Sequence, residues 1–371
     1  MKKNILIVYT CYGTGHYMAT KAIEEYIKRY YPNYNIILLD PLSYSRPLLN
    51  KIVSKIGKIL STRLRIIKES FYKHQMYKKF SEQSPLFMFG INLFWSNKLK
   101  RKLKKINPYI IISTQVGATA LIASHKNIIN TKLISVFTDY GVHRMHTITH
   151  ENVDIFCVPN NEIKDKLLSI GVKENKIKIT GIPVRSQFLN NKVDKQEIIE
   201  KYKLIKNKPI FLFMCGGGLG LDNAFTYFIE LLRLDYDFSY IFISGKNKDL
   251  YRKAKFVASM YKKQGIVLGY INEIDKLIKC SDLVFGKPGG IMTSETLNIG
   301  IPICAIEPIS GQENYNALFI KNNNFGFYIK NKKSFKRFLR KIKRNKIDLQ
   351  EYKKNIKNNF NKFKFIDIDK I

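Results

Sequence analysis

Long apolar runs and paired cysteines are both missing from this chain of 371 residues. No stretch of about 18 or more consecutive apolar residues occurs, which excludes an ordinary membrane-spanning helix. Met1 to Tyr9 lead directly into an apolar strand without a signal peptide, so we expect a cytoplasmic protein. The lack of any Cys-x-x-Cys pair argues against a disulfide framework or a zinc site and predicts free thiols. The five cysteines stand at positions 11, 157, 215, 280 and 304.

Acidic residues are also scarce, with 29 Asp and Glu against 64 Lys and Arg and a formal net charge of +35. Frequent Lys, Asn, Ile and Tyr suggest a codon bias, but the charge is clustered. Residues 43–106 contain 16 basic and two acidic residues, and residues 330–371 contain 16 basic and four acidic ones. Clustered positive charge predicts a polyanionic partner, either nucleic acid or an anionic membrane surface.

Large apolar side chains are interleaved with Lys and Arg between residues 43 and 105. Basic amphipathic helices of this composition lie well in an anionic lipid interface. The other interpretation is a set of helices that pack on the domain core and expose a solvated basic face. No signature of an RNA-binding module occurs, so we expect an anionic phospholipid surface as partner and no nucleic acid.

Short apolar runs alternate with amphipathic helical stretches along most of the chain, beginning with a strand at 4–9 and a helix at 17–30. This pattern is typical of parallel strands with helices on both faces. We predict an α/β fold of two doubly wound, Rossmann-like domains that face each other across a cleft, with the ligand at the carboxyl ends of the strands. The expected parts are a domain at 1–185, a linker at 186–208, a domain at 209–330 and a basic helical tail at 331–371.

The most informative segment runs from 286 to 316. A glycine turn at 286–290 opens a helix, and free N–H groups at a helix start favour a phosphate. Glu295 lies one turn further along, where its carboxylate is placed to accept hydrogen bonds from sugar hydroxyls. A second strand then leads into the polar loop Gln312-Glu313-x-x-Asn316. Phosphate and sugar contacts in one segment predict a nucleotide-sugar site.

Gly13-Thr14-Gly15-His16 stands between the first strand and the helix expected from Tyr17. Glycines at this junction allow the backbone to approach a ligand closely. The competing interpretation is a dinucleotide fingerprint, although Thr10-Cys11-Tyr12 lengthens the turn. The His16 imidazole is a candidate base for an acceptor hydroxyl near neutral pH. The alternative is a histidine that only hydrogen-bonds backbone in its loop.

Two further motifs follow predicted strands. Thr138-Asp139-Tyr140-Gly141-Val142-His143 places Asp139 and His143 where they orient an acceptor or assist proton transfer. Histidines at 143, 146 and 150 have the spacing of one helical face, but no carboxylate completes a metal set, so no metal site is expected. The loop 216–220, which includes Gly217, is a phosphate cradle or a tight turn and lacks the ending of a P-loop.

Taken together, these motifs resemble glycosyltransferase family 28, in the branch of monogalactosyldiacylglycerol synthases and processive diacylglycerol glucosyltransferases. The resemblance covers roughly residues 4–330. It rests on Gly-Thr-Gly-His at 13–16, Thr-Asp-Tyr-x-x-His at 138–143, Lys-Ile-x-Ile-Thr-Gly-Ile-Pro-Val at 176–184, Lys-Pro-Gly-Gly at 287–290 and Gly-Gln-Glu at 311–313. The sequence departs from the branch at His146, where many relatives have Trp.

The resemblance implies a GT-B fold, a UDP-sugar bound by the 209–330 domain and a lipid acceptor that enters from the 1–185 domain. It implies that Glu295 binds the ribose hydroxyls, that the backbone near Ile271 faces the uracil, and that His16 faces the acceptor hydroxyl. The implied diphosphate contacts are Gly289, Gly290, Ile291, Met292 and Thr293, and the implied donor-sugar contacts are Gln312, Glu313 and Asn316. The candidate from the glycine loop at 216–220 is Gly217, and the acceptor candidates are Gly13, Thr14, Gly15 and His143.

The leading hypothesis is an inverting transfer of a hexose from UDP-glucose or UDP-galactose to the 3-hydroxyl of diacylglycerol, at the cytoplasmic face of the cell membrane. His16 acts as the base and Asp139 orients it, and neither a metal nor another cofactor is expected because the helix start after Gly289 stabilises the UDP leaving group. One alternative is a UDP-GlcNAc transferase with an undecaprenyl-linked acceptor. Another is a non-catalytic basic membrane or nucleic-acid binder on a GT-B scaffold.

Overall fold

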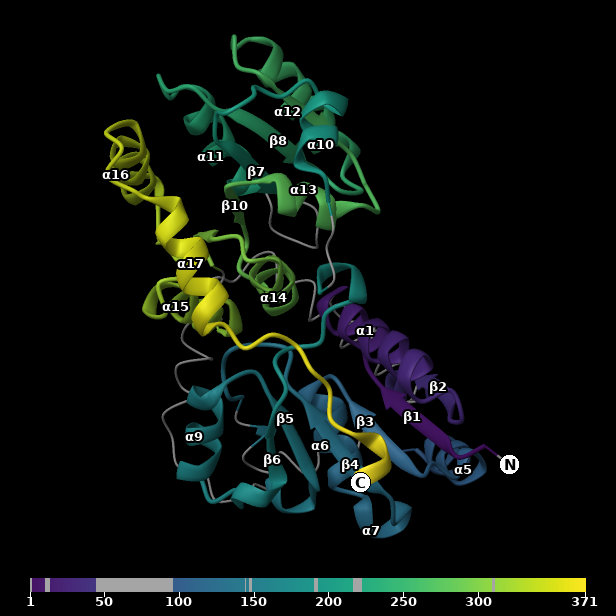
Figure 1. The fold of residues 1–371 in the computed structure, drawn as a ribbon. Helices are drawn as coiled ribbons and strands as arrows, with labels where there is room; N and C mark the ends of the chain where they lie inside the picture. The colour runs from purple at the N-terminus through teal and green to yellow at the C-terminus, as the bar shows by residue number, and fades with distance from the viewer. Residues whose placement is uncertain are drawn as a thin grey trace. The chain divides into compact units, whose positions relative to one another are not determined.

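The computed structural model describes residues 2–10, 14–44, 96–143, 145–146, 149–189, 193–215, 222–308 and 311–371. The chain forms two compact units (Figure 1). The first unit comprises Met1–Ser186, Ser310–Gln312 and Asn361–Ile371, and the second comprises Gln187–Ile309 and Glu313–Phe360. Most of the basic segment at 43–106, and with it the prediction of a lipid-binding surface there, lies outside the described residues.

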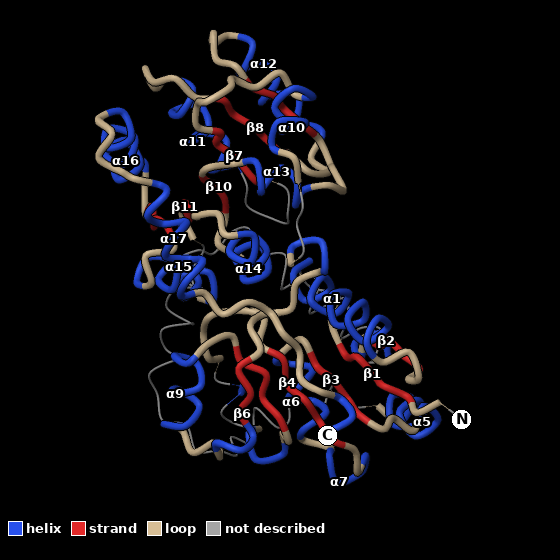
Figure 2. Tube along the Cα trace, in the orientation of Figure 1, coloured by secondary structure: helices blue, strands red, loops and turns tan. Residues whose placement is uncertain are grey.

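The first unit is built on a six-stranded parallel sheet with the strand order β2-β1-β3-β4-β5-β6 (Figure 2). Its central strands are apolar on both faces, as Ile5, Leu6, Ile7 and Val8 show by being fully buried. Such strands need helices on both faces of the sheet. The strands are β1 (Asn4–Val8), β2 (Asn35–Leu39), β3 (Ile110–Ser113), β4 (Lys132–Val136), β5 (Ile155–Val158) and β6 (Ile177–Ile179).

The helices of the first unit are α1 (Thr14–Tyr30), α5 (Asn97–Ile106), α6 (Val116–Ala123), α7 (Lys126–Ile129) and α9 (Asn161–Ser169). Helix α5 is the described end of the basic segment. It buries Leu99, Leu103 and Ile106 in the core and leaves its lysines and Arg101 outside that contact. For this helix, the structure therefore shows the second interpretation: it packs on the domain core and carries a basic outer face.

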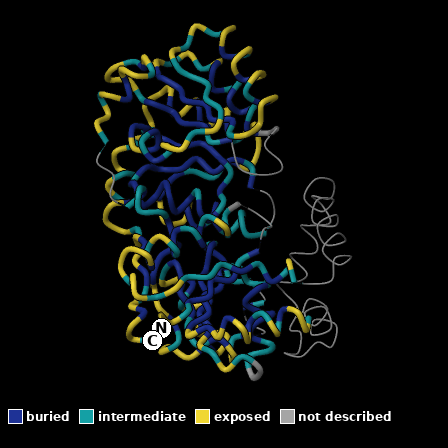
Figure 3. The backbone as a smooth tube through the Cα atoms, turned by 90° about the vertical axis from the view of Figure 1, so that its right-hand side faces the viewer, coloured by how far each residue is buried: buried dark blue, intermediate teal, exposed yellow. Residues whose placement is uncertain are grey.

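The second unit contains another six-stranded parallel sheet, in the order β12-β11-β10-β7-β8-β9. Its strands are β7 (Ile210–Met214), β8 (Ser239–Ile243), β9 (Gly265–Leu268), β10 (Leu283–Gly286), β11 (Ile303–Ile306) and β12 (Gly326–Ile329). An aromatic core fills the space beside this sheet, where Phe213 stacks on Phe285 with ring centroids 4.5 Å apart. Figure 3 shows the buried interior of each unit in dark blue.

The helices of the second unit are α10 (Lys195–Lys201), α11 (Asp222–Leu232), α12 (Lys248–Ser259), α13 (Ile274–Cys280), α14 (Gly290–Ile299), α15 (Gln312–Asn322), α16 (Lys332–Lys343) and α17 (Leu349–Asn359). Gln312, the first residue of α15, groups with the first unit. Five short 3₁₀ turns complete the described structure: Pro41–Tyr44, His150–Asn152, Glu174–Lys176, Ser186–Phe188 and Ile368–Lys370.

The structure differs from the sequence prediction in the connecting segments. The expected linker at 186–208 contains α10, which packs on α13 because Ile198 and Ile199 are buried. The segment at 331–371 is not a separate tail. Helix α16 contributes Phe335 and Phe338 to the core of the second unit, and residues 361–371 belong to the first unit. Strand β12 was not predicted.

Residues 361–371, called here the returning segment, pack along the first unit. The rings of Phe363 and Phe365 lie against Tyr26 of α1, with centroids 6.0 and 5.8 Å away. The backbone N–H of Lys364 donates to the Thr180 carbonyl at 2.8 Å. Gly181 has φ +72°, and a Cβ on it would lie 3.0 Å from the Phe363 Cα. The glycine of the Thr-Gly-Ile-Pro motif is thus required by the close approach of this segment.

Candidate active site

The strand order places the predicted site residues where doubly wound sheets bind ligands. Ligands lie outside the carboxyl ends of the strands, at the point where the strand order reverses. In the first unit that point is between β1 and β3, and in the second it is between β7 and β10. The loop before His16 follows β1, and the turn at 287–289 follows β10. Each unit therefore carries its main candidate motif at its own switch point.

His16 is held by the ends of two other strands. Its Nδ1 lies 2.9 Å from the Thr114 carbonyl oxygen, just after β3, and 3.1 Å from the Thr138 hydroxyl, just after β4. A carbonyl oxygen only accepts, so Nδ1 carries the hydrogen and Nε2 carries the lone pair. Within the described part of the chain, Nε2 has no hydrogen-bond partner. A neutral imidazole fixed in this tautomer is arranged to accept a proton at Nε2.

The backbone around His16 is fixed as well. The Thr20 hydroxyl donates to the His16 carbonyl at 3.0 Å and lies 2.9 Å from the buried Thr114 hydroxyl. The helix begins at Thr14 rather than at the predicted Tyr17, so Gly15 and His16 form its first turn instead of a preceding loop. This earlier start points free N–H groups of α1 toward the carboxyl end of the sheet.

The segment after β4 folds around two histidines that accept backbone hydrogen bonds. His146 Nδ1 accepts from the His143 N–H at 3.1 Å, and His143 Nδ1 accepts from the Met145 N–H at 3.1 Å. His146 also stacks on Phe137 with ring centroids 4.0 Å apart. Burial, with a smaller contribution from His143, lowers the pKa of His146 to about 3, and burial lowers the pKa of His143. Both rings therefore act as neutral acceptors that shape the turn.

The turn at 287–289 leaves the start of α14 open. Gly289 caps the helix without a side-chain hydrogen bond, and the first bond of the helix runs from the Thr293 N–H to the Gly289 carbonyl at 2.9 Å. The N–H groups of Gly290, Ile291 and Met292 consequently have no acceptor within the helix. A Cβ on Gly289 would meet no atom within 4 Å, so the space in front of these groups is open.

Nearly all of α14 is buried, including its polar residues. Three of those side chains bond to a carbonyl four residues earlier, at 2.7–2.8 Å: Ser294, Thr296 and Asn298. The Thr293 hydroxyl is the exception, because it is fully buried and has no hydrogen-bond partner among the described residues. A buried polar atom left unpaired in a native structure indicates strain, function or a missing ligand.

Helix α15 holds the turn in place. Glu313 forms an ion pair with Lys287 at 2.5 Å between Oε1 and Nζ, and the Asn316 amide donates to the Pro288 carbonyl at 2.9 Å. Asn316 is fully buried, so its observed role is to support the turn. The predicted donor-sugar contacts of Gln312, Glu313 and Asn316 stay predictions, but two of the three residues are tied directly to the predicted phosphate turn.

The other candidates are placed as follows. Glu295 lies on the second turn of α14 and is 8% exposed. Ile271 lies half-buried in the loop between β9 and α13. Asp139 is half-buried after β4, beside Thr138, and its orienting role stays a prediction. Gly13 and Gly217 lie outside the described residues, and the side chain of Thr14 does too.

Three residues of the site were missed from the sequence: Thr114, Thr138 and Lys287. Thr138 adjoins the Thr-Asp-Tyr motif and Lys287 begins the Lys-Pro-Gly-Gly motif, so both stood in segments already singled out. Thr114 follows a plain apolar strand and is 98 residues from His16 in the chain. Only the pairing of β1 with β3 brings it into contact.

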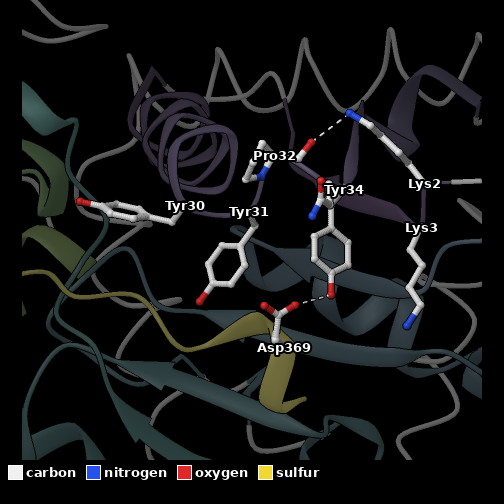
Figure 4. A pocket seen from close by; sticks show the side chains of 8 residues that line it. Lys2, Lys3, Tyr30, Tyr31, Pro32, Tyr34 and Asp369 are labelled. Carbon is white, nitrogen blue, oxygen red and sulfur yellow. Dashed lines mark hydrogen bonds between the residues drawn. The ribbon is translucent and has the colours of Figure 1, made fainter.

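A cavity of about 290 Å³ lies elsewhere in the first unit, at the amino end of β1 (Figure 4). It is lined by Lys2, Lys3, Tyr30, Tyr31, Pro32, Asn33, Tyr34 and Asp369. The Tyr34 hydroxyl donates to Asp369 at 2.7 Å, which raises the pKa of Tyr34 to about 12. None of the predicted site residues lines this cavity, because they follow the opposite, carboxyl ends of the strands.

No helix in the described ranges is both long enough and apolar enough to cross a bilayer. No group of three or more His, Cys, Asp or Glu side chains in the same ranges is arranged to hold a metal ion.

Family models match both parts of the chain. Residues 16–184 match the model of monogalactosyldiacylglycerol (MGDG) synthase, and residues 211–370 match the model of the glycosyltransferase family 28 C-terminal domain. The first match lies within the first unit, and the second covers most of the second unit together with residues 310–312 and 361–370 of the first. They also cover the segments that contain His16, Glu295 and the turn at 287–289.

Among solved structures, the chain is similar to MurG of Acinetobacter baumannii, with a TM-score of 0.66 and 12% identity over 96% of this chain and 95% of that one. It is also similar to Alr3699/HepE of Anabaena in complex with UDP, with a TM-score of 0.57 and 10% identity over 96% and 94% of the two chains. At these identities the likeness shows the fold, which is the GT-B arrangement of two Rossmann-like domains.

Sequence relatives are more similar. The processive diacylglycerol beta-glucosyltransferase of Bacillus licheniformis is 32% identical over 362 residues, which is 96% of this chain and 90% of the relative. The protein of the same name from Bacillus pumilus is 30% identical over 363 residues, with the same two coverages. The chain therefore belongs to glycosyltransferase family 28, in the branch that contains the monogalactosyldiacylglycerol synthases and the processive diacylglycerol glucosyltransferases.

Proposed function

We propose that this protein is a glycosyltransferase that moves a hexose from a UDP-sugar to diacylglycerol. The relatives named as diacylglycerol beta-glucosyltransferases extend over nearly the full chain, and they favour UDP-glucose as the donor. UDP-galactose is the second donor to test, because the model that matches residues 16–184 is that of MGDG synthase. The acceptor atom is the 3-hydroxyl oxygen of diacylglycerol.

The observation that carries the proposal is the open start of α14. Free N–H groups at Gly290, Ile291 and Met292 attract an anion, and Gly289 leaves space in front of them. A diphosphate at this position fits both features. In this proposal Glu295, on the next turn, accepts hydrogen bonds from the ribose hydroxyls.

The acceptor half of the proposal rests on His16. The acceptor oxygen forms a bond to the anomeric carbon, the bond from that carbon to the UDP oxygen breaks, and the acceptor proton moves to His16 Nε2. One displacement inverts the anomeric centre and gives a β-glycoside. Thr114 and Thr138 hold the ring through Nδ1 in the tautomer that leaves Nε2 able to accept that proton.

The remaining parts of the proposal concern the surroundings of the reaction. The leaving UDP is stabilised by the helix start of α14, so the proposed route needs no metal ion or further cofactor. The enzyme works on an anionic phospholipid membrane at its cytoplasmic face, because the acceptor is dissolved in lipid and the chain carries a net charge of +35.

The test incubates the purified protein with diacylglycerol in detergent micelles and one donor at a time: UDP-glucose, UDP-galactose or UDP-GlcNAc. We expect a β-hexosyl diacylglycerol, formed equally well with EDTA. His16→Ala should lower kcat about 10²- to 10⁴-fold with UDP affinity unchanged, whereas Glu295→Ala should weaken UDP affinity. The proposal would be overturned if the protein turned over only UDP-GlcNAc with an undecaprenyl-linked acceptor. It would also be overturned if the protein did not bind UDP.

A further inference from the structure

Helix α16 carries a dense set of positive charges on the donor-binding unit. Residues 332–346 include nine Lys and Arg and no Asp or Glu, and all nine basic residues are exposed. Within the described chain, two of them form ion pairs, Lys336 with Glu230 at 3.5 Å and Lys343 with Asp235 at 2.7 Å. The other seven have no acidic partner in that part of the structure.

Five of the seven unpaired charges share one side of the helix. Phe335, Phe338, Leu339 and Ile342 are buried in the core, and at 3.6 residues per turn they define the inward side. The side opposite is the α16 cationic face, which consists of Lys333, Arg337, Arg340, Lys341 and Arg344. The two ion-paired lysines lie on the flank, where the helix meets α11 and the loop after it.

The helix dipole favours the basic residues of the last turn, Arg340, Lys341 and Lys343, but other features of the arrangement are unfavourable for the helix. Lys333, Arg337 and Lys341 follow one another at four-residue intervals, and Arg340 and Arg344 do the same, so like charges are adjacent along the helix surface. Lys332 and Lys333 also stand in the first turn, which has no acidic residue and where the helix dipole disfavours cations. Folding does not require such a face, and an external anionic partner would compensate for its repulsion.

We propose that the α16 cationic face binds the headgroups of an anionic phospholipid surface and so brings the donor-binding unit to the membrane. The twelve residues of α16 extend for about 18 Å, which spans several headgroups. No aromatic side chain is exposed on the helix, because Phe335 and Phe338 are buried, so the face lacks the stacking platform of single-stranded nucleic-acid sites. The choice of a lipid partner rests on the proposed function.

The test compares two variants with equal loss of charge in the same unit. The face variant is Arg337→Gln, Arg340→Gln, Lys341→Gln and Arg344→Gln. The matched control is Lys248→Gln, Lys253→Gln, Lys255→Gln and Lys262→Gln, four exposed lysines on and just after α12. Binding is measured by co-sedimentation with phosphatidylglycerol–phosphatidylcholine vesicles, without any UDP-sugar, at low and physiological salt.

We expect the face variant to bind these vesicles at least about 100-fold more weakly, given roughly five-fold for each basic residue near an anionic surface. The control should lose far less, and the melting temperature of the face variant should equal or exceed that of the parent because repulsion is relieved. Equal losses in both variants would overturn the proposal by showing a net-charge effect. If the face variant bound vesicles as the parent does but no longer bound single-stranded RNA, the partner of the α16 cationic face would be nucleic acid rather than lipid.

Activity separates this proposal from the proposed function. In detergent micelles without anionic lipid, the face variant should turn over diacylglycerol as fast as the parent, since none of the four residues belongs to the active site. A parent protein that binds vesicles through α16 but transfers no sugar in micelles would refute the proposed function and leave the lipid-binding face standing. If the face variant lost activity in micelles and the matched control did not, a role of the α16 cationic face limited to membrane binding would be refuted.

Discussion

At the residue scale, the chemistry of the site depends on how one imidazole is held. The two contacts to His16 Nδ1 come from neighbouring strand ends, and they settle which nitrogen is protonated. The carbonyl of Thr114 is sufficient to fix the tautomer. The hydroxyl of Thr138 adds a second contact and limits rotation of the ring.

Replacing Thr138 by Val should therefore slow turnover without affecting the donor. Loss of one hydrogen bond of about 0.5–1.5 kcal/mol corresponds to a decrease in kcat of about 2- to 12-fold, with UDP affinity unchanged. Thr119→Val is the matched control, because Thr119 is also buried but bonds to Ser113 and Gln115 rather than to His16. Equal kcat values for the two variants would show that Thr138 does not position the ring.

His146 gives a prediction about pH. Its pKa is about 3 in the folded protein against about 6.5 in the unfolded chain, so folding opposes its protonation. The stability that depends on the neutral ring is present above pH 6.5 and is lost as the pH falls toward 3. Between pH 7 and pH 5 the free energy of unfolding should decrease by about 2 kcal/mol from this group.

Urea titrations at several pH values measure this slope. His146→Phe keeps an aromatic ring against Phe137 and removes the titrating group, so its stability should vary less over the same range. A slope as steep in the variant as in the parent would assign the effect to other groups. His143, whose pKa is also lowered by burial, contributes with the same sign.

At the scale of the element, α14 combines a buried body with an unfinished start. A capping side chain at position 289 would improve the helix, since Asp and Ser are preferred there over Gly, yet the position carries Gly with open space around it. Stability and ligand binding thus make opposite demands on this position.

Gly289→Asp should separate the two demands. The new carboxylate should stabilise the protein by about 0.3–1 kcal/mol through capping and the helix dipole, and its charge should weaken UDP binding at least about 10-fold. Gly289→Ala, which adds no charge, is the control and should retain most of the UDP affinity. Calorimetric titration with UDP and a thermal melt give both values. Unchanged UDP affinity in the Asp variant would place the diphosphate elsewhere.

Elements and their local motifs were largely predictable, whereas contacts between distant elements were not. The apolar run at 155–158 coincides with strand β5, because parallel strands that are buried on both faces consist almost entirely of apolar residues. The turn at 287–289 and Glu295 lie in a single βα unit formed by β10 and α14, so their proximity follows from local geometry. Thr114 beside His16 depends on strand order, which short-range patterns do not contain. Helix α10 was missed because only Ile198 and Ile199 interrupt its polar surroundings.

At the scale of the whole molecule, the returning segment is an integral part of the first unit. Phe363, Phe365 and Ile368 are each no more than 6% exposed. Phe365→Ala should cost about 3–5 kcal/mol of unfolding free energy, measured by urea denaturation of the full-length protein. The exposed neighbour Lys364→Ala should cost far less, because its side chain points outward while its backbone N–H bonds to Thr180. Equal effects of the two changes would show that the segment is held mainly by its backbone.

The returning segment follows the second unit in the chain, and this order has a consequence for biosynthesis. When the ribosome has completed Ser186, the first unit still lacks the residues that cover Tyr26 and Gly181. The whole of the second unit is translated before they appear. At about 5–20 residues per second, the nascent first unit waits on the order of 10–40 s for its final segment. The unit that begins first is thus the last to receive all of its residues.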